Sequence, residues 1–493
     1  MLIYDLATAN GGVVWSLLIR NIHMKVRIIA IGVWFFSVFL LPAQTFRVIY
    51  HFTGSSSAYV NGQLFLIGNT LYGTTGGGGN ALEGTVFKVN TNGTGYKIIK
   101  NFSALDTITF TNADGAQPMA GLVLWSNQLY GTTYTGGSGK RGTIFGVDPE
   151  GTNFVVLNNF SGTNGKNPYV GLTLSDNTLF GATAAGGISN KGAIFRVDPD
   201  GGGYTVIKSF LAGEGVLLMS PVIVDRQTIY GTTMSGGISN RGTIFSVGTN
   251  GDGFTVLKTF AAGDGSQPRY GLILCGKTLY GVTDGNGVNS NSIVYRMNTD
   301  GSGYNVLKRF SEPDPVSGTN ADGSYLQGGM VMWDGVLYGT AGWGGLYDNG
   351  VVFKINPDGT GFAILKQFPD YTGTSNGYGI NSDGAYPRGD LMVANGVLYG
   401  VTLYGGNYGD GTLFSLTIPP PPPLQITNLA DQALIFWNDD GLNRILRTTA
   451  DFVAGNWTNV TTLTWTNAAA NPKQIGFQIT NCFNSPAAFF RLQ

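Results

Sequence analysis

The sequence predicts an all-β protein: a seven-bladed β-propeller of four-stranded antiparallel blades, closed by its N-terminal strand and followed by a small β-sandwich-like module. Three observations lead to this prediction. One sequence unit recurs seven times, each unit contains four short strand signals, and the strand that the last unit lacks is found before the first unit. Repeated groups of four antiparallel strands are typical of propeller blades.

An aromatic residue followed by glycine marks each unit, and successive pairs lie 50 residues apart in the middle of the array and 58 to 61 apart elsewhere. A Gly-Thr-x-Phe element follows the pair in most units. This period is longer than that of short-repeat solenoids. The seven aromatic residues are Tyr72, Tyr130, Phe180, Tyr230, Tyr280, Tyr338 and Tyr399.

Alternating runs of Val, Ile, Thr and aromatic residues lie between the glycine-rich segments, for example at residues 121–124, 129–133, 143–147 and 154–157. Such runs predict four strands per unit. Asp-Gly and Asn-Gly steps supply the positive φ angles that tight hairpin turns require, which accounts for the 77 glycines of this 493-residue chain.

The ends of the array predict a closed ring. A strand that ends in Phe follows each of the first six units, whereas the seventh unit runs from Phe414 directly into the prolines at 419–423. The missing copy lies at residues 46–52. We expect this strand to complete the seventh blade, because that pairing removes the exposed sheet edges that an open array would leave. An open array is the alternative.

The chain divides into four predicted segments. Residues 1–43 form an N-terminal extension and signal peptide, 44–418 the propeller, 419–423 a stiff polyproline linker and 424–493 a C-terminal β module. A basic stretch that begins at Met24, the expected start, precedes 14 apolar residues, as in secretory signal peptides. We therefore expect a secreted or cell-surface protein with no membrane span in the mature chain. A retained membrane anchor is the alternative, although the apolar run is shorter than the ~20 residues of a span.

The composition excludes several classes of function. Charged residues make up 12% of the chain, with 28 Lys and Arg against 29 Asp and Glu, and no basic stripe indicates a nucleic-acid partner. Of the two histidines, only His51 falls in the array, so a standard zinc site is not expected, nor a Ser-His-Asp triad unless His51 serves it. Cys275 and Cys482 fall in different segments and are predicted to be unpaired, buried residues.

Candidate ligand-binding residues come from the loops that join one unit to the next, which we expect to share a face with the Gly-Gly loops. A partial ring of acids there could bind a cation or orient sugar hydroxyls, although Asp before Gly is also what a tight turn selects. The second unit has Asn164 at this position. The candidate acids are Asp114, Glu214, Asp264, Asp322 and Asp383.

No catalytic residue and no metal ligand is assigned from the sequence. The turn at Asp198 and Asp200 leaves calcium open as an alternative to no cofactor, but most copies of this turn offer one carboxylate or none, which favours hairpin geometry. The repeats contain no unique polar cluster. An asymmetric site is therefore expected in the longer loops at 105–117, 312–325 and 370–386.

The unit Leu-Tyr-Gly-Thr-Thr, Gly-Gly, Gly-Thr-x-Phe, Asp-Gly-x-Gly-Tyr and Val-Leu-Lys-x-Phe resembles the GloVer repeat of Gloeobacter and Verrucomicrobia over about residues 46–416. The resemblance implies an exported bacterial protein, and it brings no catalytic residues. The tail, which ends in Phe-Phe-Arg-Leu, resembles C-terminal modules of verrucomicrobial exported proteins, which implies sorting or surface association. A plain stability or spacer domain is the alternative.

Three functions remain open. A monomeric, non-catalytic binding or adhesion scaffold for polysaccharide or a cell-surface protein fits the export signal and the low charge. A glycan-active lyase or hydrolase is the first alternative, because acids near one mouth of the ring could act in acid/base catalysis. A purely structural envelope protein is the second. Fold alone does not decide among them.

Overall fold

The computed structural model describes residues 44–54, 58–60, 62–285, 292–312, 314, 320–375 and 378–419, together with short strands in both terminal regions. The chain divides into two units, Met1–Leu41 and Pro42–Gln493. In the first unit, β1 (Ala7–Ala9) pairs with β2 (Gly12–Val14). The predicted signal peptide and the linker prolines after Pro419 lie outside the described residues.

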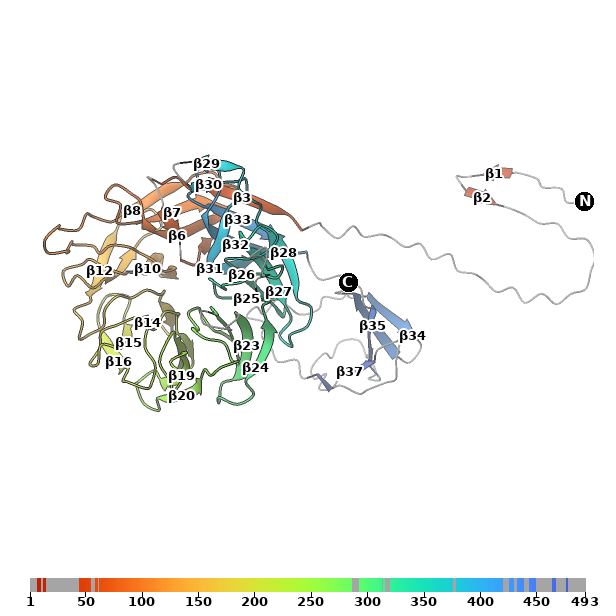
Figure 1. The fold of residues 1–493 in the computed structure, drawn as a ribbon. Helices are drawn as coiled ribbons and strands as arrows, with labels where there is room; N and C mark the ends of the chain where they lie inside the picture. Colours follow the sequence, from red (N-terminus) through yellow and green to blue (C-terminus); the bar gives the residue numbers. More distant parts are fainter. Residues whose placement is uncertain are drawn as a thin grey trace, which may run out of the picture. The chain divides into compact units, whose positions relative to one another are not determined.

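Seven antiparallel sheets are arranged as a ring, which confirms the predicted fold class (Figure 1). Blade 1 contains β4 (Ala58–Val60), β5 (Phe65–Ile67), β6 (Thr70–Gly77), β7 (Thr85–Asn90) and β8 (Lys97–Asn101). Blade 2 contains β9 (Val123–Trp125), β10 (Gln128–Thr133), β11 (Thr143–Val147) and β12 (Phe154–Asn159). Blade 3 contains β13 (Thr173–Ser175), β14 (Thr178–Thr183), β15 (Ala193–Val197) and β16 (Thr205–Ser209).

The other four blades follow the same order. Blade 4 contains β17 (Ile223–Asp225), β18 (Thr228–Thr233), β19 (Thr243–Gly248) and β20 (Thr255–Thr259). Blade 5 contains β21 (Ile273–Cys275), β22 (Thr278–Thr283), β23 (Ile293–Asn298) and β24 (Asn305–Arg309). Blade 6 contains β25 (Val331–Trp333), β26 (Val336–Ala341), β27 (Val351–Ile355) and β28 (Ala363–Gln367). Blade 7 contains β31 (Ala385–Ala394), β32 (Val397–Tyr404), β33 (Thr412–Thr417) and β3 (Phe46–His51), and β29 (Gly373–Ser375) pairs with β30 (Tyr378–Ile380) before it.

The N-terminal strand closes the ring as predicted. Strand β3 pairs antiparallel with β33, with Val48 opposite Phe414 and Tyr50 opposite Leu413. The Phe52 N–H continues the ladder by donating to the Gly411 carbonyl at 3.0 Å. The edge of the last blade is therefore covered by the strand that precedes the first.

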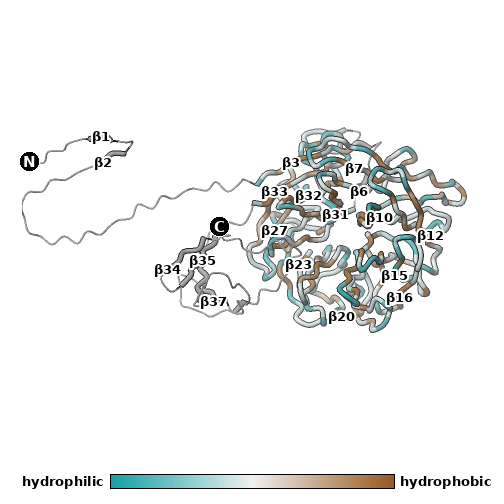
Figure 2. Tube along the Cα trace, turned by 180° about the vertical axis from the view of Figure 1, so that it is seen from behind, coloured by the Kyte–Doolittle hydropathy of each residue, from teal (hydrophilic) through white to brown (hydrophobic). Residues whose placement is uncertain are grey.

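The hydrophobic core consists of seven clusters, and each cluster lies between two consecutive blades. The cluster at the closure joins Phe52 and Leu413 of blade 7 to Leu71 and Phe87 of blade 1. Hydrophobic and hydrophilic residues alternate along the blades (Figure 2), so each sheet presents apolar side chains to its neighbours. No blade can bury its faces alone, which is why the repeats stack.

Three aromatic rings repeat at every interface, and they explain the recurring motif residues. At the interface between blades 1 and 2, Phe102 packs edge-on against Phe145 at 5.3 Å between ring centroids, and Phe154 stacks on Phe145 at 5.7 Å. A Cβ on Gly131, the glycine of the aromatic-Gly pair, would lie 2.6 Å from the Phe145 ring. Glycine is therefore required at this position, because the ring of the next strand covers its Cα.

Figure 1 also labels strands of the C-terminal module, which form one antiparallel sheet in sequence order. These strands are β34 (Gln425–Leu429), β35 (Gln432–Asn438), β36 (Asn443–Thr448), β37 (Leu463–Thr466) and β38 (Gly476–Phe477). Half-buried Cys275 of β21 is disulfide-bonded, so the expectation of an unpaired cysteine is wrong there, while Cys482 lies outside the described residues. Within the described part of the chain, no helix has the length and apolarity needed to cross a membrane.

Candidate functional site

Each of the five candidate acids forms an ion pair with a lysine from the outer strand of the preceding blade. The separations are 2.6 Å for Lys100–Asp114 and 2.8 Å for both Lys208–Glu214 and Lys258–Asp264. Lys308 pairs with Asp322 and Lys366 with Asp383 in the same way. The five acids therefore lie in the predicted loops, and each is paired with a lysine.

The lysine of each pair also contacts an aromatic ring of the next blade. Lys100 Nζ lies 4.1 Å from the Phe154 ring centroid, while Asp114 accepts hydrogen bonds from the backbone N–H and the hydroxyl of Ser103. The ion pair, the cation–π contact and the loop hydrogen bonds together tie one blade to the next. The ion pair and the cation–π contact recur at the Lys208, Lys258, Lys308 and Lys366 positions.

Two interfaces lack this lysine, and both lack the acid as well. Blade 2 carries Asn158 in place of the lysine, with Asn164 at the acid position. At the closure Tyr50 takes the lysine position and stacks on Tyr96 at 4.2 Å between ring centroids. Loss of both charges together is expected of structural ion pairs, because a half-buried charge is costly without its partner. Ligand binding by the acids stays a prediction.

The two kinds of loop share one face, here called the loop face. Isolated bridges join the loops after Asp114, Glu214 and Asp322 to the Gly-Gly loop of the same blade, as between Ala116 and Thr135 and between Ser324 and Trp343. On this face His51 Nδ1 accepts a hydrogen bond from the Asn407 N–H at 3.2 Å. Polar residues at the equivalent position of other blades accept the same bond, namely Asn101, Asn159, Ser209 and Gln367.

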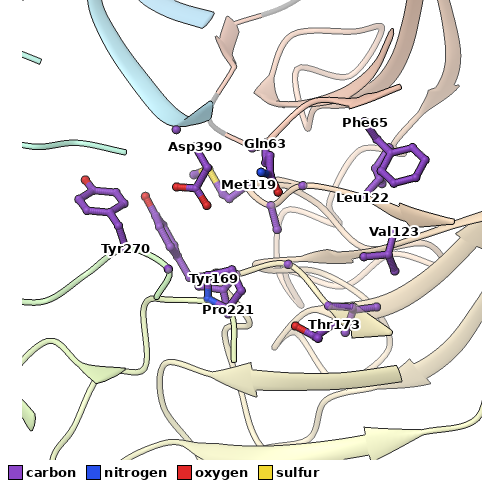
Figure 3. A pocket seen from close by; sticks show the side chains of 18 of the residues that line it. Gln63, Phe65, Met119, Leu122, Val123, Tyr169, Thr173, Pro221, Tyr270 and Asp390 are labelled. Carbon is purple, nitrogen blue, oxygen red and sulfur yellow. The ribbon is translucent and has the colours of Figure 1, made fainter. Parts of the chain in front are cut away.

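A cavity of about 430 Å³ lies where the seven blades converge, and we call it the central channel. Its lining comes from the inner strand of each blade and the short segment before it, and Gln63 and Asp390 are examples from blades 1 and 7. In Figure 3, Tyr169, Tyr270 and Asp390 gather on one side, whereas Phe65, Leu122 and Val123 lie on the other. The volume is within the range typical of small-molecule sites.

The repeat breaks at the channel wall. The residue before the first core residue of the inner strand is glycine in four blades, but Gln63, Pro221 and Asp390 in the others. Two positions earlier the described blades carry Met119, Tyr169, Met219, Arg269, Gln327 and Arg388. The framework repeats while the lining does not, so the lining is free to form a specific site.

Arg269, Arg388 and Asp390 line the channel, and Asp284 is linked to it through Arg269. Arg269 Nη1 donates to Asp284 Oδ2 at 3.0 Å, and Asp284 Oδ1 is buried with no hydrogen-bond partner among the residues that the structure describes. Burial raises the pKa of Asp284, and the Arg269 ion pair only partly offsets that rise. Burial likewise raises the pKa of Asp390, which accepts a hydrogen bond from the Gly329 N–H. A carboxyl with a raised pKa in a cleft is a candidate functional residue.

A chain of aromatic rings lies on the loop face of blades 6 and 7, and we call it the aromatic ledge. Its members are Tyr325, Trp343, Tyr386 and Tyr404, with ring centroids 6.0, 4.7 and 5.5 Å apart in that order. Tyr325 is 41% exposed and Trp343 39% exposed. Both tyrosines from the loops after the acids have positive φ, 51° for Tyr325 and 56° for Tyr386.

The ledge is confined to these two blades. At the position of Tyr325 and Tyr386 the other described blades carry Gln117, Asn167, Leu217 and Gln267, all with positive φ. At the position of Trp343 and Tyr404 they carry Gly77, Thr135, Ala185, Ser235 and Gly285. The backbone geometry therefore belongs to the fold, whereas the aromatic side chains belong to this site alone.

Sequence reasoning placed an asymmetric site in the longer loops, and two of those three loops contribute a tyrosine to the ledge. It missed the central channel, although aligning the seven units would have shown the divergent positions before each inner strand. In the residues that the structure describes, no three His, Cys, Asp or Glu side chains cluster as a metal site would need. The Asp200 carboxylate accepts a bond from the Gly202 N–H within its turn, at 2.8 Å.

The model of the Gloeobacter/Verrucomicrobia repeat matches residues 37–225 and 217–381. The chain belongs to this family. The match confirms the resemblance of this Gloeobacter/Verrucomicrobia repeat protein to the GloVer repeat. No curated protein sequence matches it.

Solved structures similar to this family member include an oligogalacturonate lyase from Vibrio parahaemolyticus, at 10% identity and a TM-score of 0.46 over 76% of this chain and 97% of that one. A second is an oligogalacturonate lyase in complex with manganese, at 12% identity and a TM-score of 0.41 over 76% and 91%. A third is a nidogen/laminin complex, at 16% identity and a TM-score of 0.34 over 53% and 82%. Function is inferred below from this chain's own residues.

Proposed function

We propose that this repeat protein is an exported, non-catalytic scaffold that binds a polysaccharide on the loop face of its propeller. The aromatic ledge is the observation that carries the proposal. Exposed aromatic rings in contact with one another mark interaction surfaces, because leaving them in water is unfavourable. Sugar rings present C–H faces that pack on such rings, and their hydroxyls suit a surface with few charges.

The dimensions of the ledge fit a chain rather than a single sugar. Three successive ring contacts of 6.0, 4.7 and 5.5 Å extend from Tyr325 to Tyr404 across two blades. Tyr347 and Tyr408, in the Gly-Gly loops of the same blades, are 46% and 47% exposed and would extend the contact surface. A polymer could lie along this row and gain from several weak contacts at once.

Two further features support export. The basic and apolar segments after Met24 are typical of a secretory signal peptide. Cys275 is disulfide-bonded, and disulfides persist mainly in oxidising compartments outside the cytosol. Both fit a protein that works outside the cell or on its surface.

Retention on insoluble polysaccharides and a glycan-array screen test the proposal. The variants restore the residue that other blades carry, Trp343→Thr and Tyr325→Gln, so the backbone is preserved. Covering the 39% of Trp343 that is exposed removes roughly 100 Å² from water, or about 2.5 kcal/mol at ~25 cal/mol/Å². We therefore expect affinity to fall at least tenfold in each variant.

The control is Ile238→Ser, which removes an exposed apolar side chain from the Gly-Gly loop of blade 4, where Ile238 is 95% exposed. Its affinity should equal that of the wild type. If the ledge variants bind like the wild type, or if Ile238→Ser weakens binding equally, the ledge is not the binding surface.

Asp390 favours a second candidate, a glycan-active lyase or hydrolase. A carboxyl with a raised pKa in a cavity has the property that a general acid requires. Incubation of oligosaccharides with the protein and analysis for shortened or unsaturated products tests it. Products that disappear in Asp390→Asn would establish the enzyme, and no product from any tested glycan would leave the scaffold as the function.

A further inference from the structure

Arg388 lines the central channel, where its charge acts on Asp284 but, among the described residues, makes no direct ion pair. The corresponding residue of blade 5, Arg269, is ion-paired with Asp284 at 3.0 Å. Within the described residues, the Arg388 side chain makes one hydrogen bond, which Nη2 donates to the Tyr169 hydroxyl at 3.4 Å. A guanidinium has five N–H donors, so most of the donors of this half-buried group remain free.

The fold does not require an arginine at this place. Equivalent positions in other blades carry methionine, tyrosine or glutamine, as at Met119 and Gln327. A half-buried, unpaired charge lowers stability unless something compensates it. The presence of an arginine at position 388, where other blades carry Met or Gln, therefore indicates that its charge interacts with a ligand in the channel.

The surroundings of Arg388 point to a small organic anion rather than an inorganic one. Figure 3 shows Pro221 beside Tyr169 and Met119 beside Asp390, which gives the cavity apolar surface next to its polar groups. Asp390 lies in the same cavity and would repel a dianion more than a monoanion. The cavity of about 430 Å³ has room for one sugar-sized molecule.

We propose that the central channel binds a small organic monoanion, of the size of one sugar acid, whose carboxylate pairs with the Arg388 guanidinium. The planar fork of arginine matches a carboxylate with two parallel N–H···O bonds. The Tyr169 hydroxyl, which already contacts Arg388, adds a donor beside the same carboxylate. This site is separate from the aromatic ledge and does not depend on the proposed polysaccharide function.

Titration calorimetry and thermal shift at fixed ionic strength test the proposal with the full chain. The probes are D-glucuronate, D-gluconate, D-glucose and inorganic phosphate. The first variant is Arg388→Gln, which places the residue of blade 6 in the equivalent position. The control is Arg226→Gln, which removes an exposed arginine from the hairpin between β17 and β18.

We expect at least one of the two carboxylates to bind the wild type and to raise its midpoint of thermal unfolding, while D-glucose does neither. Removing one partner of a hydrogen-bonded charge pair weakens binding strongly, so Arg388→Gln should lose at least tenfold in affinity while Arg226→Gln binds as the wild type does. The proposal is overturned if neither carboxylate binds, if phosphate binds more tightly than both, or if Arg388→Gln retains the wild-type affinity.

Discussion

The ion pair between Lys100 and Asp114 should stabilise the propeller through burial, and a double-mutant cycle can measure it. The two charged atoms lie 2.6 Å apart, and the side chains are only 18% and 7% exposed. Breaking a buried pair costs about 3–5 kcal/mol, whereas an exposed pair contributes about 0–1 kcal/mol. We expect Asp114→Asn and Lys100→Asn each to lower the free energy of unfolding by about 2–3 kcal/mol.

The double variant reproduces the Asn158 and Asn164 combination of the next interface. Its loss of unfolding free energy should be smaller than the sum of the losses in the two single variants. We expect a coupling energy of about 2 kcal/mol, because the double variant removes both charges and leaves neither buried without its partner. Asn also keeps an acceptor for the Ser103 N–H that Asp114 binds at 3.1 Å. Urea unfolding followed by tryptophan fluorescence at pH 7 gives the four free energies.

Lys88 and Glu150 provide a matched control within the same chain. Their charged atoms also lie 2.6 Å apart, but Glu150 is 64% exposed. The same cycle on this pair should give a coupling of about 0.5 kcal/mol or less. Equal coupling energies for the two pairs would refute the argument from burial. If Asp114→Asn instead abolished glycan binding without lowering stability, the acid would belong to a ligand site.

Three further predictions concern pH and closure. Burial lowers the pKa of His51, and Asp383 partly offsets this effect, so stability should fall as the pH drops below the ordinary histidine value near 6.5. The variant His51→Asn keeps an acceptor for the Asn407 N–H and should not show this fall in urea titrations. Burial raises the pKa of Asp390, so stability should fall as the pH rises above the ordinary aspartate range, and Asp390→Asn should be more stable than the wild type at pH 8 but not at pH 4. Deletion of residues 44–52 should expose the β33 edge, lower the thermal midpoint and promote aggregation, and a peptide of that sequence should restore the midpoint.

Each of these three has a result that would contradict it. A pH profile of His51→Asn that matches the wild type would mean that the histidine does not titrate in this range. An Asp390→Asn variant that is no more stable at pH 8 would show that its carboxyl is not destabilised by burial. A truncated chain with an unchanged midpoint would show that the ring does not depend on β3.

The sequence determined the architecture because the forces that set it act locally and repeat. Alternating β-branched and aromatic residues specify strands, and Asp-Gly or Asn-Gly steps specify the turns between them. The position of the missing strand at Phe46 to Phe52 predicted its pairing with β33, since this segment carries the strand pattern that the last unit lacks. The family followed from the same repeated residues.

Only the tertiary structure decided what the non-repeating residues do. Asp390, Tyr169 and Arg269 are separated by 100 residues or more in sequence, yet the closed ring brings them to one cavity. The ledge likewise needs Tyr325 and Tyr386 from two neighbouring blades. Local pattern fixes strands and turns, but the meeting of distant side chains depends on how seven blades close around a common axis, and that closure is a property of the whole chain.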